Sequence, residues 1–311
     1  MKPENNPRIV FMGSPEFALP TLAALHQHFK LVGIVTQPDK PAGRGRRMTP
    51  PPVKIYAEKH QIPVIQPRKL TLPDPVRQIE LWNPDLIVVA AYGKILRENV
   101  LNIPKYGCIN VHASLLPRWR GAAPIQAAIL NGDSHSGCTI MLMDKGMDTG
   151  AILKQVSEPI RADDTAATLA KRLAEAGARL LIETIPAFLQ GEIIPIHQDN
   201  EQATYAPMIK KSDGELDISQ HAEILERKIR AYTPWPGTFI RLPGGKTLKI
   251  IQAHVVLDES TRHAAFIRYH NRYPAIATPS GILVLDVVQP AGKKPMQGDQ
   301  FLRGARDWGK E

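Results

Sequence analysis

Residues 8–36, RIVFMGSPEFALPTLAALHQHFKLVGIVT, hold the pattern that decides the fold. Residues 8–12 form a short apolar run typical of a strand, and Ser14 is a candidate N-cap for a helix that follows at once. The helix is predicted by apolar residues at helical spacing, namely Phe17, Leu22, Leu25 and Phe29. A second apolar run at residues 31–36 completes a strand–helix–strand unit, which predicts a parallel sheet covered by helices.

The same alternation continues to about residue 150. Residues 86–91 (LIVVAA) are apolar at every position, as expected of a central strand covered on both faces, and residues 108–112 (CINVH) form the next strand. We therefore expect an α/β N-terminal domain with a Rossmann-like, mostly parallel sheet. Such sheets bind ligands at the carboxyl ends of their strands, where Asn110 and His112 lie.

The second half of the chain changes character. The longest predicted helix covers residues 164–190, where Pro186 is expected to kink or end it. After this helix the apolar residues no longer follow a helical spacing. Further on, short β-branched runs separated by Gly and Pro turns predict a small OB-like β-barrel or sandwich. The expected organisation is a catalytic domain at 1–190, a linker at 191–207 and a C-terminal β domain at 208–311.

Length and composition bound the class of protein. The chain has 311 residues, 43% apolar and 22% charged, which is typical of a soluble globular protein of two domains. No apolar run approaches the roughly 18 residues that cross a bilayer, and the first residues, MKPENNPRIV, lack the apolar core of a signal peptide. We therefore expect a cytoplasmic protein with no membrane partner. Cys108 and Cys138 have no zinc-binding spacing, so we expect reduced, buried thiols and no metal.

The net charge of +9 permits an anionic partner. Residues 207–311 carry 16 Lys and Arg against 11 Asp and Glu, whereas residues 1–206 carry 23 against 19. The last third of the chain is therefore about twice as basic per residue as the rest.

Asn110 and His112 form the first candidate for chemistry. Residues two apart in a strand project to the same face, so the carboxamide and the imidazole share one space. A carboxamide donates a hydrogen bond to an oxygen that gains negative charge, and an imidazole carries protons near neutral pH, so the pair suits acyl transfer. For this pair alone, a buried histidine beside a turn-forming asparagine is the more common arrangement.

A carboxylate beside His112 would fix the tautomer of the ring and stabilise its charged form. Residues 141–150 (MLMDKGMDTG) offer Asp144 and Asp148 in a glycine-rich loop. Spacing alone does not choose between these two residues, and aspartates in a loop are ordinarily part of the turn.

Longer stretches carry a resemblance. Residues 108–129 (CINVHASLLPRWRGAAPIQAAI), followed by residues 143–150 (MDKGMDTG), resemble the signature of the folate-dependent formyltransferases. The likeness extends over nearly the whole chain, through residues 11–22, 35–54, 204–217 and 289–296. It implies transfer of the formyl group of 10-formyltetrahydrofolate to the α-amino group of methionine on initiator tRNA, with no obligate protein partner.

The resemblance also implies roles for individual residues. Asn110 donates to the oxyanion, His112 assists it or relays the amine's proton, and Asp148 orients His112. The folate-binding stretch consists of Ser114, Leu115, Leu116 and Pro117. Arg118 and Arg120, on either side of Trp119, are candidates for gripping the RNA end or the folate tail, although such a triplet is more often plain surface.

The loop at residues 37–52 is basic, with Lys40, Arg44, Arg46 and Arg47 against a single Asp39. Such a run is usually a solvated flap, but the resemblance implies contact with the acceptor stem of tRNA, and arginines suit phosphate recognition. Lys210 and Lys211 are candidates for contact with the tRNA backbone.

Two other classes of function stay open at this point. One is a related enzyme acting on a small amine such as an amino sugar or glycinamide ribonucleotide, or a formylfolate hydrolase. The other is a non-catalytic RNA-binding protein. The basic loop and the basic second domain favour a tRNA substrate, because a small acceptor has no evident use for them.

Overall fold

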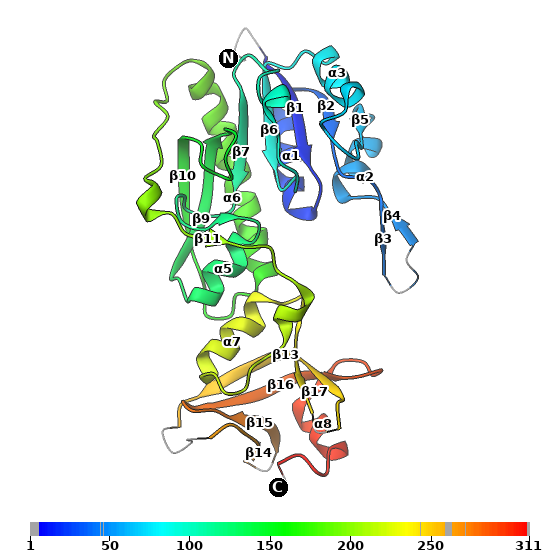
Figure 1. Cartoon of the computed structure of the whole chain (residues 1–311), viewed down its shortest axis with the longest axis vertical. Helices are drawn as coiled ribbons and strands as arrows, with labels where there is room; N and C mark the ends of the chain where they lie inside the picture. The colour runs from blue at the N-terminus through cyan, green and yellow to red at the C-terminus, as the bar shows by residue number, and fades with distance from the viewer. Residues whose placement is uncertain are drawn as a thin grey trace. The chain divides into compact units, whose positions relative to one another are not determined.

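The computed structural model describes residues 6–43, 45, 47–242, 244–258, 263–270 and 272–309. The chain forms two compact units (Figure 1). Unit 1 comprises Met1–Pro124, His135–Pro159 and Ala170–Ala206, and unit 2 comprises Ile125–Ser134, Ile160–Leu169 and Pro207–Glu311.

Unit 1 is built on a seven-stranded sheet. The strands lie in the order β10 (Ile152–Pro159), β9 (His135–Leu142), β7 (Cys108–His112), β6 (Leu86–Ala90), β1 (Arg8–Gly13), β2 (Lys30–Val35) and β5 (Val64–Ile65). The five strands from β7 to β5 pair in parallel, while β9 is antiparallel to β7 and β10 is antiparallel to β9. The predicted mixed α/β class with a mostly parallel sheet is confirmed.

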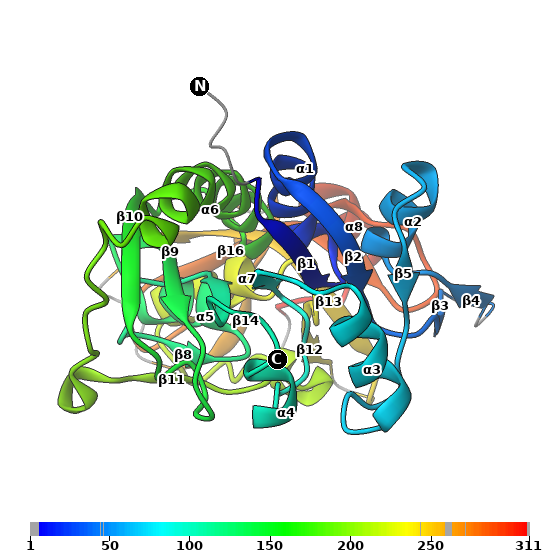
Figure 2. The same ribbon diagram turned by 90° about the horizontal axis from the view of Figure 1, so that it is seen from above.

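Apolar cores cover both faces of this sheet, which explains why β6 is apolar throughout. Leu86, Val88 and Ala90 belong to one core, and Ile87 and Val89 belong to the other. Figure 2 shows α1 (Leu19–His28) and α6 (Ala166–Leu189) along the first face, and α3 (Pro73–Leu81) and α4 (Glu98–Leu101) along the second. The remaining helices of the N-terminal half are α2 (Pro52–Lys59) and α5 (Pro124–Asn131).

Ser14 does not cap the first helix. A short 3-10 turn, η1 (Glu16–Ala18), comes between it and α1. The Ser14 hydroxyl instead accepts hydrogen bonds from Thr36 Oγ1 at 3.3 Å and from the backbone N–H of Gln37 at 3.1 Å. Its role is to tie the turn after β1 to the end of β2.

Pro186 does not end α6, which continues to Leu189. A proline removes only its own N–H bond, and the carbonyl of Pro186 still accepts from the N–H of Gln190 at 3.1 Å. Leu181 and Ile185 are fully buried in the core of unit 1 and hold this end of the helix in place.

Residues 191–206, where the sequence predicts a linker, pack within unit 1. Ile196 bridges Ile152, η2 (Asn200–Gln202) follows, and β11 (Tyr205–Ala206) pairs in parallel with β8 (Arg120–Gly121). The domain boundaries drawn from the sequence stay a prediction, because each compact unit is itself discontinuous along the chain.

Unit 2 contains an antiparallel sheet packed against a helix. Its pairing path runs β12 (Thr238–Arg241), β13 (Thr247–Val256), β16 (Ile282–Pro290), β15 (Tyr273–Ala277) and β14 (Ala265–Tyr269), and β17 (Met296–Gln297) pairs with β16. The core forms between these strands and the helices α7 (Ala222–Ala231) and α8 (Gly298–Gly304). The β character of this part is confirmed. Closure into a barrel stays a prediction, because β12 and β14 do not pair with each other in the described part of the chain.

The two cysteines are free and buried, as the sequence predicts. Burial raises the pKa of each thiol to about 12, so both remain protonated at neutral pH. Within the described ranges, no helix has the length and apolarity needed to cross a membrane. The same residues place no group of three or more His, Cys, Asp or Glu side chains where it could hold a metal ion.

Candidate active site

Asn110 and His112 lie at the carboxyl end of β7, between the parallel strand β6 and the antiparallel strand β9. Their spacing in the strand puts both side chains on one face. Asn110 is half-buried, and no described residue gives its carboxamide a hydrogen-bond partner. His112 is only 6% exposed. The carboxamide is therefore available to a ligand, while the imidazole is enclosed by protein.

The imidazole of His112 lies between two acceptors. Its Nε2 is 3.0 Å from the carbonyl oxygen of Trp119, and its Nδ1 is 3.7 Å from Oδ1 of Asp148. A carbonyl oxygen only accepts, so Nε2 donates to Trp119 and Nδ1 is the ring nitrogen that faces the carboxylate. The second distance is too long for a direct hydrogen bond and within reach of an ion pair. The structure thus brings His112 and Asp148 together through Nδ1, whereas Nε2 is not free for a substrate.

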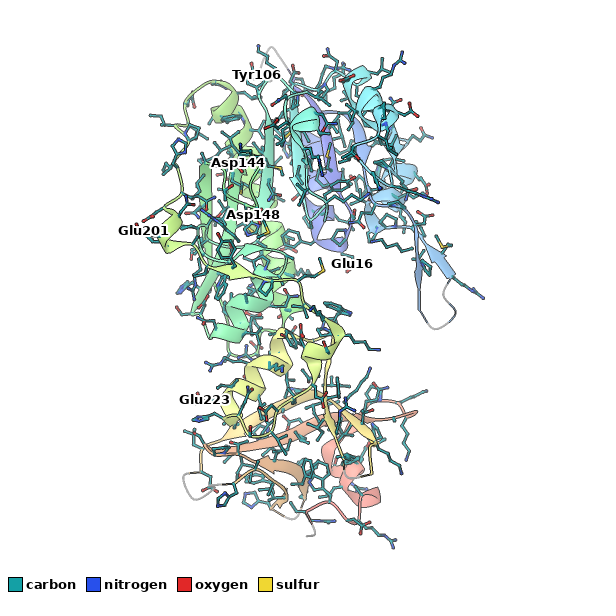
Figure 3. All side chains as sticks on the ribbon, in the orientation of Figure 1. Glu16, Tyr106, Asp144, Asp148, Glu201 and Glu223 are labelled. Carbon is teal, nitrogen blue, oxygen red and sulfur yellow. The ribbon has the colours of Figure 1, made fainter. Side chains whose placement is uncertain are left out.

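Asp148 is held by the backbone of strand β8. Its Oδ2 accepts from the N–H of Gly121 at 2.9 Å, and its own φ of 55° lies in the left-handed region. Asp144, labelled with Asp148 in Figure 3, is exposed and accepts from the Gly146 N–H at 2.9 Å and from Thr149 Oγ1 at 2.6 Å. Asp144 therefore stabilises the turn, and Asp148 is the carboxylate beside the histidine.

Two residues support this carboxylate in a way that the sequence does not predict. Arg120 is 1% exposed, and its Nε and Nη2 donate to Oε1 of Gln198 at 3.0 and 2.8 Å. The Gln198 amide nitrogen donates in turn to the carbonyls of Asp148 at 2.9 Å and Gly150 at 2.7 Å. Burial makes Arg120 a structural residue rather than a surface grip for RNA. No local signal marks Gln198, which lies where the sequence loses its periodicity.

The stretch from Ser114 to Pro117 is tied into the protein. The Ser114 hydroxyl donates to the carbonyl of Arg118 at 2.6 Å, and Thr139 Oγ1 donates to the carbonyl of Ser114 at 2.6 Å. Thr139 Oγ1 accepts from the N–H of Leu116 at 3.1 Å. Ser114 and Leu116 are buried, while Leu115 and Pro117 are half-buried. Folate contact by this stretch stays a prediction, and the half-buried Leu115 and Pro117 are the members that offer an apolar surface.

The basic loop forms a hairpin of two short strands, β3 (Lys40–Ala42) and β4 (Arg47–Thr49), which extends away from the sheet of unit 1 (Figure 1). Lys40 and Arg47 are exposed. Arg44 and Arg46, also predicted to bind tRNA, lie outside the described residues. In unit 2, Lys210 and Lys211 are exposed at the start of the short turn η3 (Lys211–Gly214).

Comparison with known proteins identifies the family to which this chain belongs. A model of the formyl transferase family matches residues 7–185, and a model of the formyl transferase C-terminal domain matches residues 208–306. The chain is 47% identical over 298 residues to the methionyl-tRNA formyltransferase of Citrifermentans bemidjiense, covering 96% of this chain and 93% of that protein. It is 46% identical over 300 residues to the methionyl-tRNA formyltransferase of Myxococcus xanthus, covering 96% of each.

Solved structures of lower identity share the fold. An N-formyltransferase from Helicobacter canadensis, in complex with folinic acid and dTDP-3-aminofucose, aligns with a TM-score of 0.66 at 20% identity, covering 89% of this chain and 98% of that chain. HypX from Aquifex aeolicus, in complex with tetrahydrofolic acid, aligns with a TM-score of 0.61 at 17% identity, covering 96% of this chain and 47% of that chain. At these identities the likeness extends to the fold alone.

Proposed function

Because the chain belongs to the methionyl-tRNA formyltransferase family, we propose that its site moves the formyl group of 10-formyltetrahydrofolate onto the α-amino group of methionine carried by initiator tRNA. The observation that carries this proposal is the convergence of Asn110, His112 and Asp148 at one edge of the sheet. A cytoplasmic location is part of the proposal, since charged tRNA is made and used there.

The reaction begins when the neutral amine attacks the formyl carbon. A carbon–nitrogen bond forms, the carbonyl oxygen becomes an oxyanion, and the attacking nitrogen becomes positively charged. The Asn110 carboxamide, which has no partner among the described side chains, donates to this oxyanion. One donor of this kind contributes about 2.7–4 kcal/mol at an oxyanion hole.

The proton of the attacking amine then has to reach the leaving nitrogen. Nδ1 of His112 is the ring nitrogen that no backbone carbonyl occupies, so in the neutral ring it takes the proton, and Asp148 at 3.7 Å stabilises the imidazolium that forms. The carbonyl of Trp119 keeps the ring from rotating. Return of the proton to N10 of the folate accompanies cleavage of the bond between N10 and the formyl carbon.

The donor substrate supplies the formyl group, and the described residues fit it in part. Apolar Leu115 and Pro117 offer a surface to the flat pterin, whereas the backbone of Leu116 is already hydrogen-bonded within the protein. For the acceptor, Lys40 and Arg47 of the hairpin and Lys210 and Lys211 of unit 2 are exposed cations suited to phosphate.

The direct test follows labelled formyl from 10-formyltetrahydrofolate to methionyl initiator tRNA, with free methionine and a nucleotide-linked amino sugar run in parallel. We expect transfer to the tRNA alone. Transfer to the amino sugar at an equal or higher rate would contradict the proposed acceptor.

The mechanism predicts the effect of Asn110→Ala. Loss of the oxyanion donor should lower kcat by about 100- to 1000-fold with little change in the KM for either substrate, since the interaction develops in the transition state. Steady-state kinetics measure it, with Asn102→Ala as the control because Asn102 is exposed on α4's C-terminal end. Turnover equal to wild type in a folded Asn110→Ala variant would rule out the assigned role.

A further inference from the structure

Among the described residues of the β3–β4 hairpin, none packs in an apolar core. The two strands pair with each other alone in the part of the chain that the structure describes, and β4 is exposed at all of its positions, including Met48 at 62%. A lone two-stranded hairpin is marginally stable in water. Its direction must therefore be set by contacts at its base, where the chain leaves and rejoins unit 1.

Gln37 forms the first part of that base. Its backbone N–H donates to Ser14 Oγ at 3.1 Å, its side-chain amide donates to the carbonyl of Tyr92 at 2.7 Å, and its carbonyl accepts from Gln66 Nε2 at 2.8 Å. These partners follow β1, β6 and β5 respectively. The chain is thus fixed to three strand ends just before the hairpin begins.

Asp39 forms the second part. Its carboxylate accepts from Lys54 Nζ at 3.0 and 2.9 Å and from Gln66 Nε2 at 2.6 Å. Hydrogen bonds from Gln66 and Lys54 hold the pKa of Asp39 below its ordinary value, so the group is ionised at neutral pH. The side chains of Lys54 and Asp39 are 20% and 29% exposed. The carboxylate therefore joins the hairpin to α2 and to the segment after β5.

The same base borders the carboxyl edge of the sheet, the edge at which Asn110 and His112 also lie. A pocket of about 350 Å³ lies at the carboxyl ends of β1, β2 and β6, and Gln37, Lys40 and Thr49 line it from the hairpin side. A change in hairpin direction would alter the shape of this pocket together with the path of the exposed cations.

We propose that Asp39 is a positioning residue for the acceptor: clamped by Lys54 and Gln66, it fixes the direction of the β3–β4 hairpin and thereby sets the affinity for methionyl-tRNA. The inference rests on the proposed function, because it assumes that the hairpin contacts tRNA. A carboxylate in a basic hairpin repels a phosphate backbone, so the charge of Asp39 by itself would weaken the binding of RNA.

Because of this repulsion, a charge effect and the clamp predict opposite changes in the KM for methionyl-tRNA. If Asp39 acted only through its charge, Asp39→Asn would lower the KM for methionyl-tRNA. The clamp predicts the opposite, a rise of about tenfold, with kcat and the KM for 10-formyltetrahydrofolate within about twofold of wild type, because a charge-assisted hydrogen bond that orders the hairpin is lost.

Two matched pairs complete the design. Lys54→Met removes the other half of the clamp and should raise the KM for methionyl-tRNA as Asp39→Asn does, while Lys59→Met removes an exposed lysine of the same helix and should not. Glu58→Gln is the control for loss of a negative charge nearby, since Glu58 is 59% exposed and 3.9 Å from Lys54. A fall or no change in the KM of Asp39→Asn, or equal behaviour of the two lysine variants, overturns the clamp.

Amide hydrogen exchange without tRNA separates this inference from the proposed function. Exchange across residues 40–49 should be faster in Asp39→Asn and Lys54→Met than in wild type and in Lys59→Met. A wild-type protein that forms no formylmethionyl-tRNA would remove the proposed function. Unchanged exchange in both clamp variants would overturn the clamp whether or not transfer is observed.

Discussion

At the scale of single residues, Asp148 has an uncommon left-handed backbone conformation, and its carboxylate lies beside His112. A left-handed conformation costs about 1–2 kcal/mol for a residue with a side chain. The Gly121 N–H on its carboxylate and the Gln198 amide on its carbonyl offset this cost and aim Oδ1 at His112. Gln198 also satisfies the buried guanidinium of Arg120, so one side chain supports both sides of the site.

Gln198→Leu should therefore affect catalysis and stability together. The loss of the bonds to Asp148, Gly150 and Arg120 leaves buried polar groups unpaired, which lowers the free energy of unfolding by about 1–3 kcal/mol. Displacement of Asp148 should reduce kcat by about tenfold or more, with the KM for 10-formyltetrahydrofolate unchanged. Chemical denaturation and steady-state kinetics measure the two effects, and exposed Gln202→Leu is the control. A normal kcat in the Leu variant would show that Gln198 supports the fold alone.

At the scale of elements, the sequence predicts the strands and helices whose apolar residues follow a regular spacing along the chain. The apolar runs at β1, β2, β6 and β7 and the period of α6 are sufficient to place those elements. The edge strand β10 is half-buried or exposed at every position except Leu153, so its signal is weak. The pairing of β11 with β8 joins segments some 85 residues apart. The Asn110–His112 pair follows from strand period, whereas the partners of Asp148 depend on such distant pairing.

Gly150, in the connection from β9 to β10, permits a close approach that another residue would prevent. A Cβ at this position would overlap the carbonyl oxygen of Leu142, whose N–H is hydrogen-bonded to Ala151 at 2.8 Å. Gly150→Ala should lower the free energy of unfolding by about 1–3 kcal/mol and reduce kcat, because the loop that carries Asp148 must shift. Calorimetry and kinetics check this against Gly304→Ala, where a Cβ meets open space. Equal stability of the two variants would contradict the close approach.

At the scale of the whole molecule, the sequence predicts the sign of the partner's charge but not which cations meet it. A net charge of +9 is spread over both units, and exposed lysines occur at both edges of the sheet in unit 1. Lys30 and Lys105 lie near the amino ends of β2 and β7, away from the edge that carries Asn110 and His112. Within unit 1, position along the sheet, which only the fold supplies, therefore separates a candidate tRNA contact such as Lys40 from general surface charge.

The salt dependence of tRNA binding tests whether Lys210 and Lys211 contact phosphate. Each phosphate contact contributes about 0.9 to the slope of log affinity against log salt concentration, so Lys210→Gln with Lys211→Gln should reduce the slope by nearly 2 if both lysines contact phosphate. Lys30→Gln with Lys105→Gln removes the same number of charges and should leave the slope unchanged, because both residues lie near the amino ends of strands, away from the edge that carries Asn110 and His112. The KM for 10-formyltetrahydrofolate should stay constant in both. Equal slopes in the two double variants would mean that net charge, rather than placed lysines, accounts for the affinity.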